Sequence, residues 1–318
     1  MFFALLLTVS HAIAEPPKPS RIVHGDDQLS AHLITEGGLS DRLAAKDDSD
    51  WVLFYTGEQN GDLAPCGCAT RPRGGLPRTA ATINASGPAL FANLGGWLDG
   101  GQGLDGQPMP EAVLKNQWMA KALERMNPAA VHVGFDDLLG LPSIDAKASP
   151  LPLVSANLHG PGIERVVYAT HRGLRFAFTG VSHQGSKIVR TPGYERRDPW
   201  REAKAVIDAL PSDVDRVIVF SHGANDAAKR LARSGRVDVI IDTQDHRSFD
   251  APLRIGRAIW VRSHAQGLRL GELRVSESST LDRKIDMDDR VPDDPEQKAF
   301  ADQSAAEIKA LRKRLFGP

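Results

Sequence analysis

Short apolar runs alternate with amphipathic stretches along most of the chain. The run Trp51–Tyr55 (WVLFY) is apolar or aromatic at every position, and Thr56 and Gly57 close it. A continuous run of this kind is typical of a strand that is covered on both faces. Further runs predict strands at Ala89–Leu94, Ala130–Val133, Leu151–Ser155, Arg165–Ala169, Leu174–Gly180, Val217–Ser221, Val237–Ile241, Ala258–Val261 and Leu268–Val275.

Helical periodicity fills the intervals between these runs. Pro110–Met126 begins with proline and places its large apolar side chains on one side, at Leu114, Trp118, Met119, Ala122, Leu123 and Met126. Further helices are predicted at Leu76–Ala85, Asp198–Leu210, Asn225–Ser234 and Pro295–Phe316, the last of them charged and on the surface. Strands that alternate with helices predict a layered α/β domain.

Composition narrows the class of protein. The 318 residues include 39 Lys+Arg and 40 Asp+Glu, for a formal net charge of -1. Proteins that bind nucleic acid normally carry a basic excess, so no nucleic-acid partner is expected. Two cysteines cannot form a disulfide framework, and 41% hydrophobic residues suffice for a packed core. The chain is therefore expected to be a globular protein that folds by its own packing.

The N-terminus predicts export. Residues Phe2–Ala14 form a short apolar run that ends in small residues, as in a signal peptide with an A-x-A cleavage site, although no Lys or Arg precedes it. The run is shorter than the roughly 20 residues of a membrane span, and the alternative is an N-terminal strand. We expect a periplasmic or secreted protein without a membrane span. The predicted organisation is a signal peptide (1–14), a polar segment (15–50), one domain (51–276) and a C-terminal extension with a surface helix (277–318).

Several motifs follow the predicted strands in a characteristic order. They are EQNG at 58–61, ALFANLGGWLDG at 89–100, VHVGFDD at 131–137, VSANL at 154–158, VIVFSHG at 217–223, VDVIIDTQDH at 237–246 and LGEL at 270–273. In this order they resemble the calcineurin-like metallophosphoesterases, specifically the catalytic domain of the bacterial exported 5'-nucleotidases. The resemblance implies a four-layer α/β/β/α sandwich with mixed sheets, and a phosphate ester or nucleotide as the ligand.

In that family two divalent metals, about 3.5–4 Å apart, clamp the phosphoryl group and supply the attacking hydroxide. The resemblance places Glu58 and Asn60 at the first ligand positions and His222, Gln244 and His246 at the last. The carboxylate that bridges both metals falls on Gly96, and the next ligand, an asparagine, falls on Phe135. Asp136 takes the position of the histidine that assists the leaving oxygen, which makes it the candidate catalytic residue.

These replacements imply a degenerate metal site, with at most one divalent ion such as zinc or manganese, and a catalytically impaired protein. Two alternatives stay open. The first is an active phosphoester hydrolase with a remodelled site of Glu58, Asn60, His222 and His246, to which Asp99, Asp136, Asp137, Asp242 and Asp245 could add carboxylates. The second is a binding module without turnover, in which Arg71 or Arg73 holds the phosphate.

The cysteines form the motif Pro65-Cys66-Gly67-Cys68, which in this context resembles a subgroup of exported 5'-nucleotidase-like proteins. Three hypotheses compete for the pair. Cys66 and Cys68 form a strained bridge or a buried free pair, or they act as a redox site near Arg71 and Arg73. Alternatively they bind zinc together with His222 and His246 in a tetrahedral S2N2 set. Trp97 beside Gly95-Gly96 is a candidate for stacking on a ligand ring, although packing is favoured.

Overall fold

The computed structural model describes residues 50–65, 72–104, 106–183, 191–243, 252–276 and 279–317, together with the backbone of Arg21–His24. Several predicted features lie outside these residues: the signal peptide, the cysteine pair Cys66 and Cys68, and Arg71, Gln244, Asp245 and His246.

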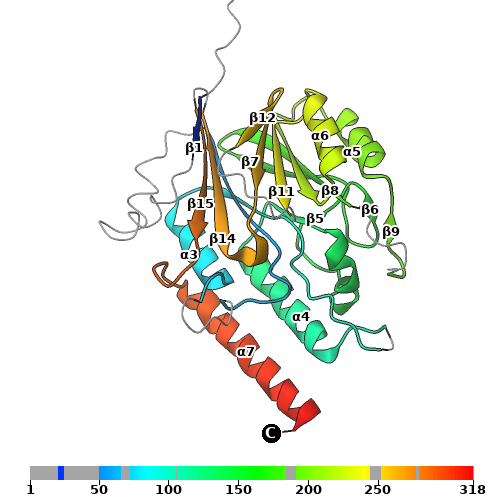
Figure 1. Ribbon diagram of the computed structural model, residues 1–318, viewed down its shortest axis with the longest axis vertical. Coiled ribbons are helices and arrows are strands. Elements are labelled where there is room, and N and C mark those ends of the chain that lie inside the picture. Colours follow the sequence, from blue (N-terminus) through cyan, green and yellow to red (C-terminus); the bar gives the residue numbers. More distant parts are fainter. Residues whose placement is uncertain are drawn as a thin grey trace, which may run out of the picture.

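Two large mixed sheets form the centre of the described part (Figure 1). The seven-stranded sheet contains, in spatial order, β1 (Arg21–His24), β15 (Ser279–Asp286), β14 (Arg269–Val275), β2 (Trp51–Thr56), β3 (Leu90–Asn93), β4 (Ala130–His132) and β5 (Leu153–Val154). The six-stranded sheet contains β12 (Leu253–Ile255), β13 (Ala258–Arg262), β11 (Val239–Thr243), β10 (Arg216–His222), β8 (Leu174–Ser182) and β7 (Val167–His171). A small separate sheet pairs β6 (Leu158–His159) with β9 (Glu195–Arg196).

Helices cover the outer face of each large sheet. The seven-stranded sheet is covered by α3 (Leu76–Ala85), α4 (Pro110–Arg125) and α7 (Pro295–Phe316), and the six-stranded sheet by α5 (Pro199–Asp208) and α6 (Asn225–Arg233). Short 3-10 helices follow β4, at η1 (Phe135–Leu139) and η2 (Leu141–Ser143), and precede β14, at η3 (Ala265–Gly267). The predicted four-layer sandwich is confirmed. No helix in the described part has the length and apolar composition to cross a bilayer.

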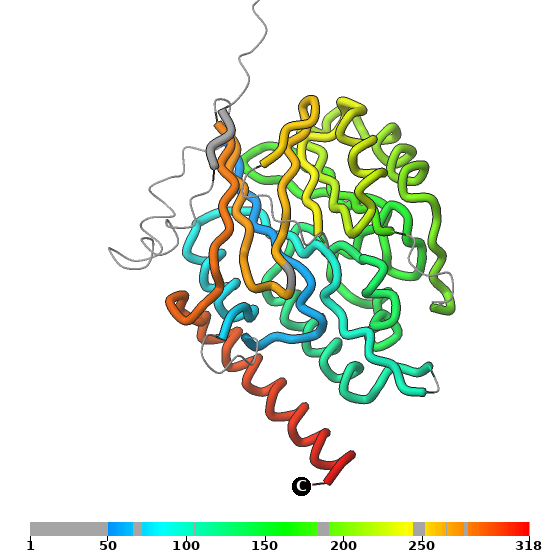
Figure 2. Tube along the Cα trace, viewed as in Figure 1, coloured from blue at the N-terminus to red at the C-terminus, as the bar shows by residue number. Residues whose placement is uncertain are grey.

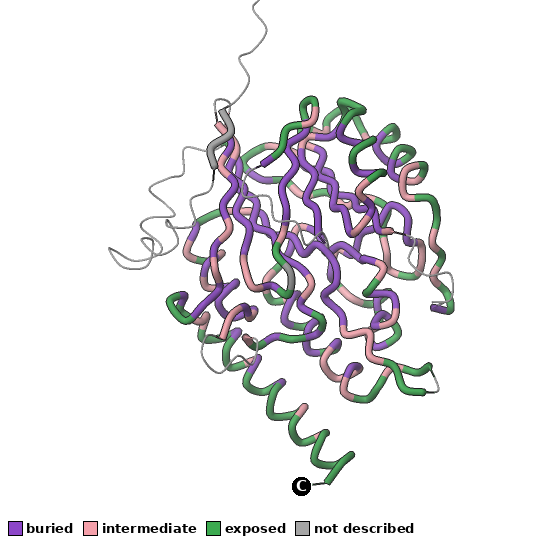
Figure 3. The backbone as a smooth tube through the Cα atoms, viewed as in Figure 1, coloured by how far each residue is buried: buried purple, intermediate pink, exposed green. Residues whose placement is uncertain are grey.

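The continuous apolar runs form the buried strands, as predicted (Figure 3). In β2 every residue is buried, because its alternate side chains enter different cores. Val52 and Phe54 pack toward the helices, whereas Leu53 and Tyr55 face the second sheet. β2 to β5 are parallel to one another, as are β8, β10, β11 and β13, so the ends of these strands lie along common sheet edges.

β15 is a strand that the hydrophobic pattern did not predict. Residues 277–318 were predicted to form an extension, yet β15 pairs with β14 inside the seven-stranded sheet (Figure 2). β1, within the predicted polar segment, pairs with the other edge of β15 (Figure 1). Charged residues of β15 are held in ion pairs: Arg283 binds Glu272 of β14, and Lys284 binds Asp282 of the same strand at 2.6 Å. Such pairs make an inner strand look polar in sequence.

Tyr55 shows why β14 requires a glycine. Its hydroxyl donates to Asp282 Oδ1 at 2.5 Å, and Lys284 Nζ donates to the same hydroxyl at 2.5 Å. To reach β15 from β2, the Tyr55 ring crosses β14 at Gly271, where a Cβ would overlap the ring. Burial, followed by the charge and hydrogen bond of Asp282, raises the pKa of Tyr55 well above its usual value.

We therefore expect Gly271→Ala to lower the free energy of unfolding by about 2 kcal/mol, the usual scale of overpacking a core. Chemical denaturation followed by tryptophan fluorescence measures this change. The double variant Gly271→Ala/Tyr55→Leu is the control, since the shorter side chain makes room for the methyl group. Equal destabilisation by alanine in both backgrounds would show that the ring crossing does not require glycine.

Candidate functional site

Loops from both large sheets meet where the parallel strands end. In the seven-stranded sheet, the N–H of Glu58 after β2 donates to a carbonyl of the loop after β3 at 2.8 Å. Between the sheets, the N–H of Phe135 after β4 donates to Ser182 Oγ at the end of β8 at 2.6 Å. The N–H of His183 donates to the carbonyl of His222, the last residue of β10, at 2.9 Å. The residues that follow β2, β3, β4, β8 and β10 therefore form one continuous edge.

His222 and Asp136 form the central pair of this edge. The imidazole of His222 is fully buried, and its Nε2 lies 3.4 Å from Oδ2 of Asp136, whose side chain is 45% exposed. Burial alone lowers the pKa of His222. The hydrogen bond to Asp136 and the charges of Asp137, Asp136 and Glu58 outweigh burial, so the pKa of His222 is raised. A carboxylate beside an imidazole favours the protonated form of the ring, and such a pair can transfer a proton.

Asp137 joins two of the loops. Its buried carboxylate accepts the backbone N–H groups of Gly96 at 2.9 Å, Leu98 at 3.0 Å and Gly134 at 2.8 Å. Burial raises the pKa of Asp137 to about 6, against these hydrogen bonds, which lower it. Asp137 therefore fixes the β3 loop against the β4 loop directly beneath His222.

The position of the expected bridging carboxylate is filled by a neighbour. Gly96 has a φ of 66°, and a Cβ placed on it would lie 3.1 Å from both Cα and Cγ of Glu58. Glu58 and Asn60 also have positive φ angles, of 60° and 51°. The amide of Asn60 donates to the carbonyl of Glu58 at 3.1 Å, which uses the amide in local structure. The backbone and side chain of Glu58 thus occupy the space that a carboxylate at position 96 would need.

Phe135 places an aromatic ring where the resemblance expects an asparagine ligand. The ring centroid lies 4.8 Å from that of His183, and the guanidinium carbon of Arg196 lies 5.3 Å from it. Burial and the charge of His222 lower the pKa of His183. This part of the edge is therefore an aromatic and cationic surface without a metal-binding oxygen from position 135.

A second histidine lies between the sheets. His132 is fully buried, its Nδ1 bonds the carbonyl of Val154 at 2.9 Å, and its ring lies over Gly180 of β8, where a Cβ would overlap it. Burial and the charge of His222 lower the pKa of His132 to about 3. The sequence analysis treats this residue only by the strand that contains it, and the structure gives it a place in the core.

Candidate ligands gather at one edge of the sheets, and two of the expected ligand positions, Gln244 and His246, lie outside the described residues. The structure brings Glu58, Asn60, His222, Asp136 and Asp137 to one edge, but in the described part of the chain no group of three or more His, Cys, Asp or Glu side chains is arranged to hold a metal ion. Two further candidate carboxylates are held in ion pairs. Asp99 lies 3.5 Å from Lys115, and Asp242 lies 3.2 Å from Arg262.

Two other predicted contacts have structural explanations. Arg73 lies 4.0 Å from Asp286 and lines a cleft rather than the His222 pair. Trp97 is fully buried in the core beneath α4, so it cannot stack on a ligand and the favoured packing role is confirmed.

Three residues near the edge were not predicted: Asn157, Ser182 and Arg196. Asn157 belongs to the motif VSANL, which carries part of the resemblance without a predicted role for this side chain. An asparagine shortly after a buried strand is the signal that could have found it. Ser182 and Arg196 carry no such local signal, because their contacts come from segments far apart in sequence.

Comparison with known proteins identifies the architecture. No family model and no curated protein matches the sequence. Among solved structures, the chain is similar to the sulfate thiohydrolase SoxB of Thermus thermophilus, with a TM-score of 0.66 and 16% identity over 82% of this chain and 61% of that one. It is also similar to the NAD nucleotidase NadN of Haemophilus influenzae, with a TM-score of 0.63 and 15% identity over 83% and 60% of the two chains.

The 5'-nucleotidase of Candida albicans gives a TM-score of 0.55 and 13% identity over 84% of this chain and 58% of that one. The chain has the metallophosphoesterase fold. The predicted resemblance is thus confirmed at the level of the fold, and the chain spans about three fifths of the length of these proteins. Gly96 and Phe135 are the positions at which this edge departs from the ligand pattern that the resemblance implies.

Proposed function

We propose that this metallophosphoesterase-like chain recognises a phosphate ester of the nucleotide class and that its two-metal hydrolysis is impaired. The observation that carries the proposal is the packing of Glu58 against Gly96: position 96 supplies no carboxylate, and a Cβ there would lie 3.1 Å from Cα and Cγ of Glu58. The ligand class is supported by the fold, since two of the similar structures are nucleotidases by name. The predicted signal peptide would place this function outside the cytoplasm.

A cleft beside the edge supports an anionic ligand. It has a volume of 690 Å³, within the range of about 300–1,000 Å³ that small-molecule sites occupy. Asn60 lies at its border with the edge, and the cations that line it are Arg73, Lys115, Lys309 and Arg312. Asp62 is the acidic residue of the lining, and it binds Lys115 at 2.9 Å. The cleft is large enough for the organic part of a phosphate ester.

The test separates binding from turnover. The chain is purified without chelator, and the binding of AMP and inorganic phosphate is measured by calorimetry with and without Mn²⁺ or Zn²⁺. Hydrolysis of 4-nitrophenyl phosphate is followed in parallel. We expect AMP to bind and hydrolysis to stay within about tenfold of the buffer rate, because no two-metal clamp forms. Metal-dependent turnover that disappears in His222→Ala would contradict impairment, and the absence of any phosphate-ester binding would contradict recognition.

A single-metal hydrolase is the second candidate. Glu58 Oε1 and His222 Nδ1 are buried without a hydrogen-bond partner, and the carboxylates of Asp136 and Asp137 lie nearby. Orphaned buried donors and clustered carboxylates favour a cation. Elemental analysis of the purified chain tests this candidate. About one zinc or manganese ion per chain, lost in Glu58→Gln but retained in Asp242→Asn, would favour it over the impaired site.

The three hypotheses for Cys66 and Cys68, a bridge or buried free pair, a redox site and a zinc site, are tested separately. Titration of free thiols in the native and the denatured chain distinguishes a bridge from a free pair. Cys66→Ser is the control, since it exposes one thiol if a bridge exists and removes one if it does not. Zinc that depends on Cys66 as well as on His222 would support the mixed site.

A further inference from the structure

Asn157 occupies the point where the end of β5 meets the end of β8. Its side chain is fully buried. Nδ2 donates to the carbonyl of Ser182 at 2.9 Å, and the N–H of Ser182 donates back to Oδ1 at 2.8 Å. The side-chain amide therefore pairs with the Ser182 peptide in both directions, as the backbone of a neighbouring strand would do.

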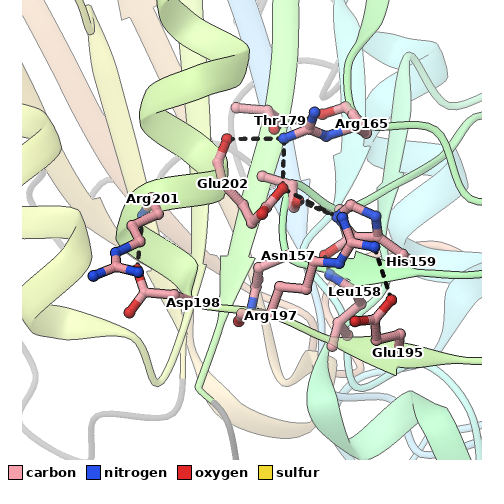
Figure 4. A network of polar contacts seen from close by, with 12 residues as sticks. Asn157, Leu158, His159, Arg165, Thr179, Glu195, Arg197, Asp198, Arg201 and Glu202 are labelled. Atoms are coloured by element: carbon pink, nitrogen blue, oxygen red, sulfur yellow. Dashed lines mark hydrogen bonds and ion pairs between the residues drawn. The ribbon is translucent and has the colours of Figure 1, made fainter.

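The same residue also binds the segment after β9. Nδ2 donates to the carbonyl of Arg197 at 3.2 Å, and the N–H of Arg197 donates to the carbonyl of Asn157 at 2.8 Å. Figure 4 shows Asn157 beside Arg197 within the polar network of this region. Asn157 thus joins three chain segments through its backbone and a single planar amide.

Two connections lead from Ser182 to the candidate site. Ser182 Oγ accepts the N–H of Phe135, and Phe135 directly precedes Asp136. The residue after Ser182 is His183, whose N–H donates to the carbonyl of His222 at 2.9 Å. The backbone segments that carry Asp136 and His222 are therefore each joined by one hydrogen bond to the Ser182–His183 segment that Asn157 holds.

We propose that Asn157 is a positioning residue for the Asp136–His222 pair, and this inference rests on the proposed function of that pair. The amide supplies one acceptor and two donors in one plane, and each of the three is used. Aspartate has the same shape but no N–H group, so it would turn a carboxylate oxygen toward the carbonyls of Ser182 and Arg197. Serine is too short to span the same partners.

Backbone amide hydrogen exchange and long-range ¹H–¹⁵N spectra of the imidazole rings test the proposal without any ligand. In Asn157→Ser we expect the amides of Ser182, Phe135 and His183 to exchange roughly tenfold faster, the factor for one lost hydrogen bond, while the core amide of Phe220 keeps its rate. The His222 ring signals are expected to move toward those of Asp136→Asn, which serves as the reference for the lost pair.

Asn116→Ala is the matched control. Asn116 is equally buried, and its amide likewise joins loops, since it binds Asp99 and the carbonyl of Gly140. Its replacement should leave the His222 signals unchanged. Acceleration in Asn157→Ser that is confined to Ser182 and Arg197, with unchanged His222 signals, would overturn the proposal.

A second variant covers the case in which Asn157→Ser does not fold. Ser182→Ala keeps the peptide that Asn157 holds and removes only Oγ. We expect faster exchange at Phe135 and shifted His222 signals, with His183 unchanged. Unchanged Phe135 exchange would overturn the inference. These measurements use no phosphate ester, so they test the role of Asn157 independently of ligand binding. A failure to bind AMP would contradict the proposed function only.

Discussion

Replacing Asp137 by alanine is expected to lower the free energy of unfolding by about 4 kcal/mol, because each buried N–H left without an acceptor costs roughly 1–3 kcal/mol. Three such groups, on Gly96, Leu98 and Gly134, share this one carboxylate. The residue is fully buried, so water reaches these donors only if the loops separate. Chemical denaturation at pH 7, followed by tryptophan fluorescence, measures the loss.

The neighbouring carboxylate is the matched control. Asp136 carries the same charge one residue earlier, but its side chain is 45% exposed and accepts no such set of backbone donors. Asp136→Ala is expected to change stability by less than about 1 kcal/mol, as is usual for exposed ion pairs. Asp137→Asn should lie between the two, because the amide retains one acceptor and turns an N–H group toward the remaining donors. Similar losses of unfolding free energy in Asp136→Ala and Asp137→Ala would show that the three hydrogen bonds accepted by Asp137 do not stabilise the loops.

Hydrogen bonds within the chain join the loops of this edge to one another. Asp137 holds the β3 loop to the β4 loop. Ser182, at the end of β8, accepts the N–H of Phe135 in the β4 loop, and its own N–H donates to the amide oxygen of Asn157 after β5. Loops of both large sheets are therefore connected through three side chains, those of Asp137, Ser182 and Asn157.

The sequence predicts the strands that are buried by apolar side chains alone, without ion pairs to other segments. β2 is apolar throughout because each face meets a hydrophobic core, so its pattern is visible from Trp51–Thr56 alone. β15 escapes prediction because its charged residues are paired: Arg283 with Glu272 of β14, and Asp282 with Tyr55 of β2 and with Lys284 of β15 itself. The partners on β14 and β2 lie far away in sequence, so they leave no local signal.

The residues of the candidate site also fall into two groups, those that the sequence motifs predict and those that only the fold brings together. The motif order places Glu58, Asn60, Asp136 and His222 at one edge, and the structure brings them there. The motif does not show that Glu58 fills the space beside Gly96, because that depends on positive φ angles at both residues. The roles of Asp137 and Asn157 depend on hydrogen bonds to segments that come together only in the fold.

Because His132 is buried in its neutral form, its contribution to the free energy of unfolding is expected to fall on acidification. Its folded pKa of about 3 lies below the usual value of 6.5, so between these pH values the unfolded chain binds more protons than the folded chain. The stability that His132 contributes is complete above pH 6.5 and is lost as the pH falls toward 3. At pH 4 the loss amounts to about 3 kcal/mol.

Asp137 acts in the opposite direction. Its folded pKa of about 6 lies above the usual 3.8, so its contribution is largest below pH 3.8 and is lost as the pH rises through 6. Between pH 4 and 7 this amounts to about 2 kcal/mol, which offsets most of the His132 effect. The unmodified chain therefore hides both contributions from a simple pH scan.

The variant His132→Phe separates them. The phenyl ring can still pack against Phe220, whose centroid lies 5.9 Å from that of His132, but it cannot be protonated. We expect the stability of His132→Phe relative to the unmodified chain to rise by about 3 kcal/mol when the pH is lowered from 7 to 4. Denaturation curves at several pH values measure the difference. Phe220→Leu is the control, because it weakens the same packing without removing a titratable group and should give a constant difference. A constant difference for His132→Phe as well would mean that His132 accepts a proton in the folded chain, and that the space between the two sheets admits a charge next to His222.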